Sequence, residues 1–204
     1  MPSTNSRTRS KPAGRDRRPG PSGASAKPSL SWSTRSRSAE ETTRIGERLA
    51  ACVIPGTVLA FTGDLGAGKT TFIRGLASGL GADRQDVCSP TFVFIHEYRG
   101  RLPLAHADLY RLSSPEELDH LGWADYLDGN WVVAVEWAEK AGLKLPADRV
   151  DIEVTHRTKG TRVISCQATG PQSRRIIGRL AMDRGPSASR TDPRRRRRSP
   201  FSRS

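Results

Sequence analysis

The chain has 204 residues, of which 35% are hydrophobic, and a formal net charge of +13. This length suits one domain with tails. No apolar run approaches the ~18 residues that a membrane span needs, and no apolar stretch follows the basic N-terminus as it would in a secretory signal. Three scattered cysteines without a CxxC pair argue against a disulfide framework or a zinc site. They fit a reducing cytosol, so we expect a cytoplasmic protein.

The positive charge is concentrated at the two ends of the chain. Residues 1–37 carry a net charge of +8 and residues 172–204 carry +9, which leaves −4 for residues 38–171. Both ends are rich in Ser, Pro, Gly and Arg, so we expect two disordered basic tails around one domain at 38–171. The five arginines at 194–198 could attract nucleic acid, but a solvated tail without interleaved aromatic residues specifies no partner.

Helix and strand patterns alternate between the tails. Ser38 is a candidate N-cap for a helix over 39–53. An apolar strand at 57–62 leads through a glycine-rich loop to a second helix at 70–81. We then expect strands at 89–101 and 102–112, helical structure at 114–127, a buried strand at 131–137 and a hairpin at 148–169. The sequence therefore predicts one α/β domain with a central mixed β-sheet flanked by helices.

The loop after the first predicted strand carries a complete phosphate-binding pattern. Residues 63–70 read GDLGAGKT and match G-x-x-x-x-G-K-[ST] without a mismatch. Glycines let backbone N–H groups turn around a phosphate, and the next helix presents the positive end of its dipole. Lys69 is expected to reach the β- and γ-phosphates, and the Thr70 hydroxyl to bind Mg²⁺. The expected nucleotide-binding residues are Gly63, Asp64, Leu65, Gly66, Ala67, Gly68, Lys69, Thr70 and Thr71.

A nucleotide site of this kind needs a second acid near the metal. Asp108 ends the run LPLAHAD, and Glu136 ends the run WVVAVE. Glu136 is the better candidate because its run is wholly apolar and should lie centrally in the sheet. Taken alone, each could be an ordinary acid at the end of a strand.

Two further residues have alternative interpretations. Thr91, in SPTF, lies after the phosphate-loop helix, where segments that sense the γ-phosphate occur, but it could equally be a plain turn threonine. His106 should face the same side of its strand as Asp108. The two could form a metal pair, although a structural or supporting histidine is the favoured interpretation.

The motifs taken together resemble the TsaE family, also called YjeE. GDLGAGKTTF, SPTF, HADLYRL, PEELDHLG and VEWAEK follow one another in the order and spacing of that family, over about residues 38–169. The resemblance implies a small P-loop ATPase that acts with TsaB and TsaD in placing a threonylcarbamoyl group on adenosine 37 of tRNAs reading ANN codons. It implies that tRNA is contacted only through that complex. ATP hydrolysis would reset the TsaB–TsaD pair, without any transfer of the threonylcarbamoyl group by this chain.

The resemblance also assigns roles to individual residues. It implies that Thr70 and Glu136 bind magnesium, with Asp108 close to the metal and the γ-phosphate. Lys69, Asp108 and Glu136 would be the catalytic residues, and Trp137 would stand beside the ATP.

Other positions carry over less directly. The resemblance places Thr91 on a switch-like loop, and residues 39–42 near the adenine. Ala138 stands where the family often has proline, and the Arg-rich tails have no counterpart in it.

Two other functions remain to be compared with this one. A P-loop small-molecule kinase would need an acceptor pocket and an Arg-bearing lid, but Arg99, Arg101 and Arg111 form no dense lid segment. A nucleic-acid-binding protein driven by its tails would bind non-specifically and with steep salt dependence. The acidic middle of the chain argues against an RNA-binding face there.

Overall fold

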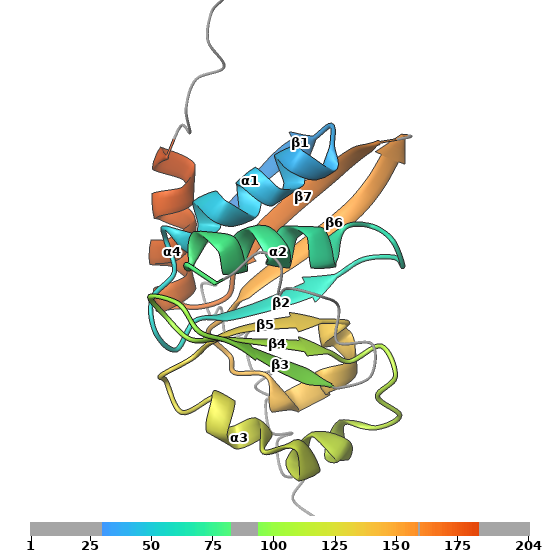
Figure 1. Ribbon diagram of the computed structural model, residues 1–204, viewed down its shortest axis with the longest axis vertical. Helices are drawn as coiled ribbons and strands as arrows, with labels where there is room; N and C mark the ends of the chain where they lie inside the picture. Colours follow the sequence, from blue (N-terminus) through green and yellow to red (C-terminus); the bar gives the residue numbers. More distant parts are fainter. Residues whose placement is uncertain (1–29, 83–93, 159, 184–204) are drawn as a thin grey trace, which may run out of the picture.

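A seven-stranded sheet lies at the centre of the protein in the computed structural model, which describes residues 30–82, 94–158 and 160–183 (Figure 1). β2 is parallel to both of its neighbours, β5 and β6, and β4 is parallel to β5. The other three pairings are antiparallel, so the predicted mixed α/β sheet is confirmed. The strand order is β1 (Ser31–Ser36), β7 (Thr161–Ala168), β6 (Val150–Thr158), β2 (Val58–Thr62), β5 (Val132–Glu136), β4 (Leu104–Asp108) and β3 (Ile95–Tyr98).

Three of the four parallel strands, β2, β5 and β4, are almost wholly apolar because both of their faces are covered. Every residue of β5 is buried, and so are the first four residues of β2 and of β4. Parallel strands end at the same edge of a sheet, so the polar residues that close them are brought together. Asp108 lies opposite Glu136 in the β4–β5 register, and Phe61 of β2 lies opposite Glu136 on its other side.

Three regular helices cover one face of the sheet: α1 (Ala39–Ala50), α2 (Lys69–Gly79) and α4 (Pro171–Met182) (Figure 1). α1 begins at Ser38, whose side chain accepts a hydrogen bond from the amide of Glu41. α1 and α2 approach closely through glycines. A Cβ on Gly75 would lie 1.9 Å from the carbonyl oxygen of Thr43, and one on Gly46 would lie 2.2 Å from that of Phe72. Among the described residues, none of the helices is both long and apolar enough to cross a membrane.

Short helical segments cover the opposite face: η1 (Pro115–Leu121), α3 (Trp123–Tyr126) and η2 (Ala138–Lys144). The helical structure expected at 114–127 is present as two pieces. Gly122 separates them, because its φ of 65° lies in the left-handed region that an α-helix cannot continue through. Ser114 caps the first piece in a capping box with Glu117.

The folded domain extends beyond the expected limits at 38 and 171 on both sides. β1 pairs along β7, and Trp32 packs against the core from this edge position. In α4, residues Ile176, Ile177 and Leu180 are buried among arginines. The expectation that residues 1–37 and 172–204 are tails is therefore wrong for 30–37 and 172–183. Residues 1–29 and 184–204 lie outside the described residues.

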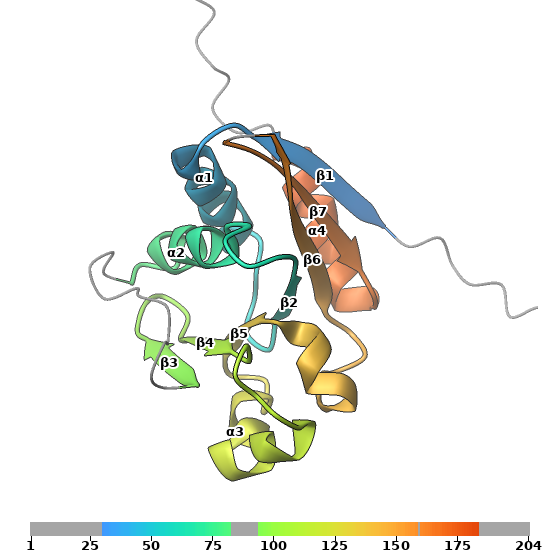
Figure 2. The ribbon, with the colours of Figure 1, turned by 90° about the vertical axis from the view of Figure 1, so that its right-hand side faces the viewer.

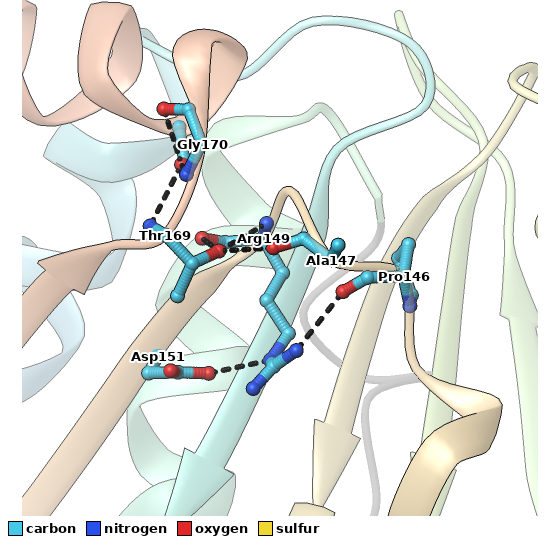
Figure 3. Close-up of polar contacts among 7 residues, drawn as sticks. Pro146, Ala147, Arg149, Asp151, Thr169 and Gly170 are labelled. Atoms are coloured by element: carbon cyan, nitrogen blue, oxygen red, sulfur yellow. Dashed lines mark hydrogen bonds and ion pairs between the residues drawn. The ribbon is translucent and has the colours of Figure 1, made fainter. Parts of the chain in front are cut away.

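Backbone hydrogen bonds and polar side chains hold the start of α4 against the loop before β6 (Figure 3). The Thr169 hydroxyl accepts a hydrogen bond from the Arg149 amide at 2.8 Å and lies 2.7 Å from the Ala147 carbonyl oxygen. Both carboxylate oxygens of Asp148 accept hydrogen bonds from α4 amides, those of Gln172 at 2.7 Å and Ser173 at 3.0 Å. These long-range contacts order α4, although its sequence resembles that of a basic tail.

Candidate nucleotide-binding site

The glycine-rich loop runs from the end of β2 to the start of α2, beside β6 and β7 (Figure 2). Gly63, Gly66 and Gly68 have φ values of 125°, 76° and 110°, which side-chain-bearing residues rarely adopt. A Cβ on Gly63 would also lie only 2.2 Å from the carbonyl oxygen of Val154. The glycine pattern is therefore required by backbone conformation at all three positions, and α2 begins at Lys69 with its N-terminal amides directed toward the loop.

Two side chains of the β6–β7 hairpin hold the outer side of this loop. His156 Nε2 lies 2.9 Å from the carbonyl oxygen of Gly66, and Arg162 Nε donates to that of Ala67 at 2.8 Å. Because the N–H of a trans peptide points opposite its carbonyl, the amide of Gly68 points away from Arg162. The hairpin thus fixes the orientation of the loop peptides from behind.

The side chain of Lys69 is folded against the loop that precedes it. Its Nζ donates to the carbonyl oxygens of Gly63 at 2.6 Å and Asp64 at 3.0 Å, and lies 4.0 Å from the centre of the Trp137 ring. Burial lowers the pKa of Lys69, opposed by the negative charge of nearby acids, of which Glu136 is the strongest. The loop carbonyls and the ring face therefore take the place of water around a buried ammonium group.

The predicted metal residues meet at the strand ends. The Thr70 hydroxyl donates to Oε1 of Glu136 at 2.7 Å, and His106 Nε2 lies 3.0 Å from the same oxygen. Asp108 closes the neighbouring strand, and its Oδ1 accepts the amide of Tyr110 at 3.0 Å. His106 is thus a supporting residue beneath Glu136, as the favoured interpretation holds.

Trp137 has an unusual backbone conformation directly after Glu136. Its φ of 57° is the one positive value among the non-glycine residues that the structure describes. This conformation is strained for a residue with a large side chain. It places the indole between Lys69 and the ring of Tyr110, whose centroid is 5.1 Å away. The strain is thus found at the residue that brings an aromatic face beside Lys69, at the end of the glycine-rich loop.

These groups surround a cavity of about 370 Å³. Such a volume lies in the range of small-molecule pockets. The cavity is lined by the loop and α2 residues Leu65, Gly66, Gly68, Lys69, Thr70 and Thr71, and by Asp108, Tyr110, Arg111, Glu136 and Trp137 from the strand ends.

Comparisons with known proteins agree on one family. The family model described as "Threonylcarbamoyl adenosine biosynthesis protein TsaE" matches residues 36–164. The chain belongs to the TsaE family. It is 44% identical to the Bacillus subtilis (strain 168) tRNA threonylcarbamoyladenosine biosynthesis protein TsaE over 142 residues, which is 69% of this chain and 87% of the relative. It is 39% identical to the Treponema pallidum (strain Nichols) TsaE over 130 residues, 64% of this chain and 96% of the relative.

A solved structure supports the same assignment. The crystal structure of Bacillus subtilis YdiB superposes with a TM-score of 0.66 at 35% sequence identity, covering 77% of this chain and 98% of that one. The seven-stranded α/β architecture is therefore that of a TsaE protein, and the resemblance found in the motifs is confirmed.

The structure brings most of the predicted site residues of this TsaE chain to one cavity. Gly63, Asp64 and Ala67 do not line it, and instead accept hydrogen bonds from Lys69 and Arg162 at their carbonyls. Thr91 lies outside the described residues. The lining also omits residues 39–42.

Four contributors were missed. Tyr110 and Arg111 line the cavity, and their positions directly after Asp108 in HADLYRL could have suggested them. His156 and Arg162 act on the loop from the hairpin. Nothing in the local sequence signals that contact, because it joins residues 90 and 95 positions apart.

Proposed function

We propose that this TsaE chain binds and hydrolyses Mg-ATP as a component of threonylcarbamoyladenosine formation on tRNA. One observation carries the proposal: the 2.7 Å contact between Thr70 and Glu136, two residues that line the same cavity as the glycine-rich loop. The TsaE family is named for tRNA threonylcarbamoyladenosine biosynthesis, and a cytoplasmic location fits that process.

The residues present fit a magnesium ion and a nucleotide phosphate chain. Magnesium prefers oxygen ligands, and a threonine hydroxyl with a carboxylate, together with Asp108 on the adjacent strand end, supply such donors. A Cβ on Gly66 would meet nothing within 4 Å, so the backbone there faces open space that a phosphate could occupy. Bound magnesium would neutralise charge that develops on the phosphates.

Each residue around the cavity would then have its own role. Lys69 would leave the carbonyls of Gly63 and Asp64 for the phosphate oxygens, which offer its ammonium a full negative charge. Glu136 would orient the attacking water, and Asp108 would support the metal. Trp137 and Tyr110 would shield one side of the phosphates from bulk water.

The expected partners are TsaB and TsaD, with tRNA contacted through their complex. We propose that the nucleotide state controls docking of TsaD through the segment around Thr91, and that hydrolysis releases it. The cavity lining contains two cations, Lys69 and Arg111. If water is the acceptor of the phosphoryl group, no separate acceptor pocket is needed. The kinase alternative predicts ADP formation that depends on an added small-molecule acceptor.

Two variants test the proposal in the full chain. Lys69→Ala should abolish ATP binding, and retention of full binding would show that the loop is assigned wrongly. Glu136→Gln should bind ATP but hydrolyse it about 100-fold more slowly, because the oriented base is lost. Unchanged hydrolysis in that variant, with a loss in Asp108→Asn, would move the catalytic role to Asp108.

A further inference from the structure

His106 is a polar side chain that is completely buried at the centre of β4. It lies on β4, beside Ala134 of β5 and His96 of β3, and has no exposed surface. Burying an imidazole among apolar strands costs free energy unless its nitrogens are paired. Its Nε2 lies 3.0 Å from Oε1 of Glu136, whose side chain is itself only 5% exposed.

The proton arrangement of this pair follows from its contacts. An ionised carboxylate only accepts hydrogen bonds, so the ring must donate through Nε2–H. Nδ1 is buried and has no hydrogen-bond partner within the described part of the chain. A proton on Nδ1 would therefore be an unpaired buried N–H, which is costlier than an unpaired acceptor nitrogen. The hydrogen bond to Glu136 therefore runs from the Nε2–H of His106.

Both recorded donors reach the same oxygen of Glu136. Thr70 donates to Oε1 from α2 at 2.7 Å, and His106 donates to it from β4 at 3.0 Å. No hydrogen bond to Oε2 is recorded from the residues that the structure describes, while Glu136 lines the cavity. Two donors from different elements thus hold one carboxylate oxygen of Glu136, a residue that also lines the cavity.

We propose that His106 is a positioning residue that orients Glu136 for the magnesium and the attacking water. The inference rests on the proposed function. The Thr70 hydroxyl would also serve as a magnesium ligand, so His106 would be the donor that serves Glu136 alone. Supporting residues that orient a metal ligand typically change metal affinity or activity by about 10- to 100-fold when removed.

Two substitutions separate positioning from mere packing. His106→Gln places an amide N–H near the position of Nε2 and keeps the donor, whereas His106→Leu fills the space without one. For His106→Leu, we expect unchanged ADP affinity without metal and a Mn²⁺ affinity in the ADP complex weakened about 10- to 100-fold. His106→Gln should recover most of that loss. Electron paramagnetic resonance of free Mn²⁺ measures this without any catalytic turnover.

The Mn²⁺ measurements test the role of His106 separately from the proposed function. Equal Mn²⁺ affinity in His106→Leu and the wild type would overturn the proposal, as would an equal loss in both variants. If the wild type binds Mn²⁺ and ADP but hydrolyses no ATP, the proposed function fails while the comparison still decides the role of His106.

A measurement on the unmodified protein covers the case in which His106→Leu does not fold. The ¹⁵N shifts of the two ring nitrogens, read from long-range ¹H–¹⁵N correlations, distinguish the tautomers. We expect the His106 ring to show a protonated Nε2. A proton on Nδ1 alone would overturn the proposal, because Nε2 could then not donate to Glu136.

Discussion

The two faces of the sheet are covered in different ways. On one face, α1 and α2 meet backbone to backbone through Gly46 and Gly75, and α4 completes a regular helical layer. On the other face, short helical segments pack apolar side chains on the sheet and are joined by side-chain hydrogen bonds, such as that from Trp123 Nε1 to the carbonyl of Lys144 at 3.1 Å. The glycine-rich loop belongs to the first face, and Trp137 with Tyr110 belongs to the second.

This difference suggests that the two sides of the cavity differ in rigidity. A layer built on close backbone contacts has little freedom to rearrange, which suits a loop that must hold its amides in fixed directions. A layer of short helical segments can open locally at lower cost than one of long, closely packed helices. The nucleotide would thus be bound by the rigid half and sensed by the half that carries Trp137.

The largest effect is expected where α1 and α2 touch. In Gly75→Ala, the added Cβ would lie 1.9 Å from the Thr43 carbonyl oxygen, so one helix must move. We expect a loss of roughly 3 kcal/mol in the free energy of unfolding. Urea denaturation followed by circular dichroism measures it, and a loss below about 1 kcal/mol would show that the two helices are not rigidly packed.

On the second face, Lys140 provides the sharpest test. Its Nζ donates to the carbonyl oxygens of Tyr110 and Leu112 and so fixes the segment after Asp108. Lys140→Met should lower the free energy of unfolding by about 1.5 kcal/mol, because charged hydrogen bonds to a partly buried backbone are lost. The matched control is Lys144→Met, which removes only the exposed ion pair with Asp119 and should cost under about 1 kcal/mol.

An equal effect of these two lysine substitutions would contradict the role given to Lys140. Fluorescence of Trp137 adds a second observable, because its ring packs on Tyr110. Lys140→Met should change the response of this fluorescence to nucleotide, while Lys144→Met should leave it unchanged.

The attachment of α4 should depend on pH. Burial acts to raise the pKa of Asp148, but hydrogen bonds from Ser173 and Gln172 outweigh it and lower the pKa below the ordinary value of 3.8. The carboxylate therefore contributes its full stabilisation above pH 3.8, and this is lost as the pH falls through the lowered pKa. Asp148→Asn should cost about 1 kcal/mol at neutral pH, and the difference should vanish in acid.

Asp151→Asn is the control for that titration. Asp151 pairs with Arg149 at 2.7 Å on the surface, where such an ion pair contributes little (Figure 3). Comparing the stabilities of wild type and both variants at several pH values isolates Asp148. A difference that persists at low pH would mean that the carboxylate charge does not hold α4.

The smallest effect should have the opposite sign. Gly178 lies within α4, and a Cβ there would meet only Leu30, at 4.0 Å. Gly178→Ala should raise the free energy of unfolding by about 0.5 kcal/mol, since alanine loses less backbone entropy in a helix. A destabilised variant would show that residues 171–182 do not form this helix in solution.

The sequence was most informative where structure depends on local backbone chemistry. Gly63, Gly66 and Gly68 have positive φ, so the glycine-rich loop between β2 and α2 could be predicted from its glycines. β1 and α4 were missed because their few apolar residues acquire meaning only from distant partners. Trp32 lies opposite Cys166, and Asp148 caps α4 across 24 and 25 positions.

The candidate site divides in the same way. Lys69, Thr70 and Glu136 could be predicted to meet, because strand ends and a helix start converge at one edge of a parallel sheet, and all three line one cavity. The hydrogen bond from Arg162 to the carbonyl of Ala67 and the left-handed conformation of Trp137 follow from tertiary contacts that no local pattern encodes.

The proposed function is that of a magnesium-dependent ATPase whose turnover depends on TsaB and TsaD. We would measure ATP hydrolysis by the full chain, alone and with purified TsaB and TsaD from the same organism, with Glu136→Gln as control. We expect weak turnover by the chain alone and a changed rate when TsaB and TsaD are added together. Glu136→Gln should show neither the turnover nor the change in rate. Turnover that is indifferent to TsaB and TsaD would contradict the proposed function and leave a P-loop enzyme with another acceptor.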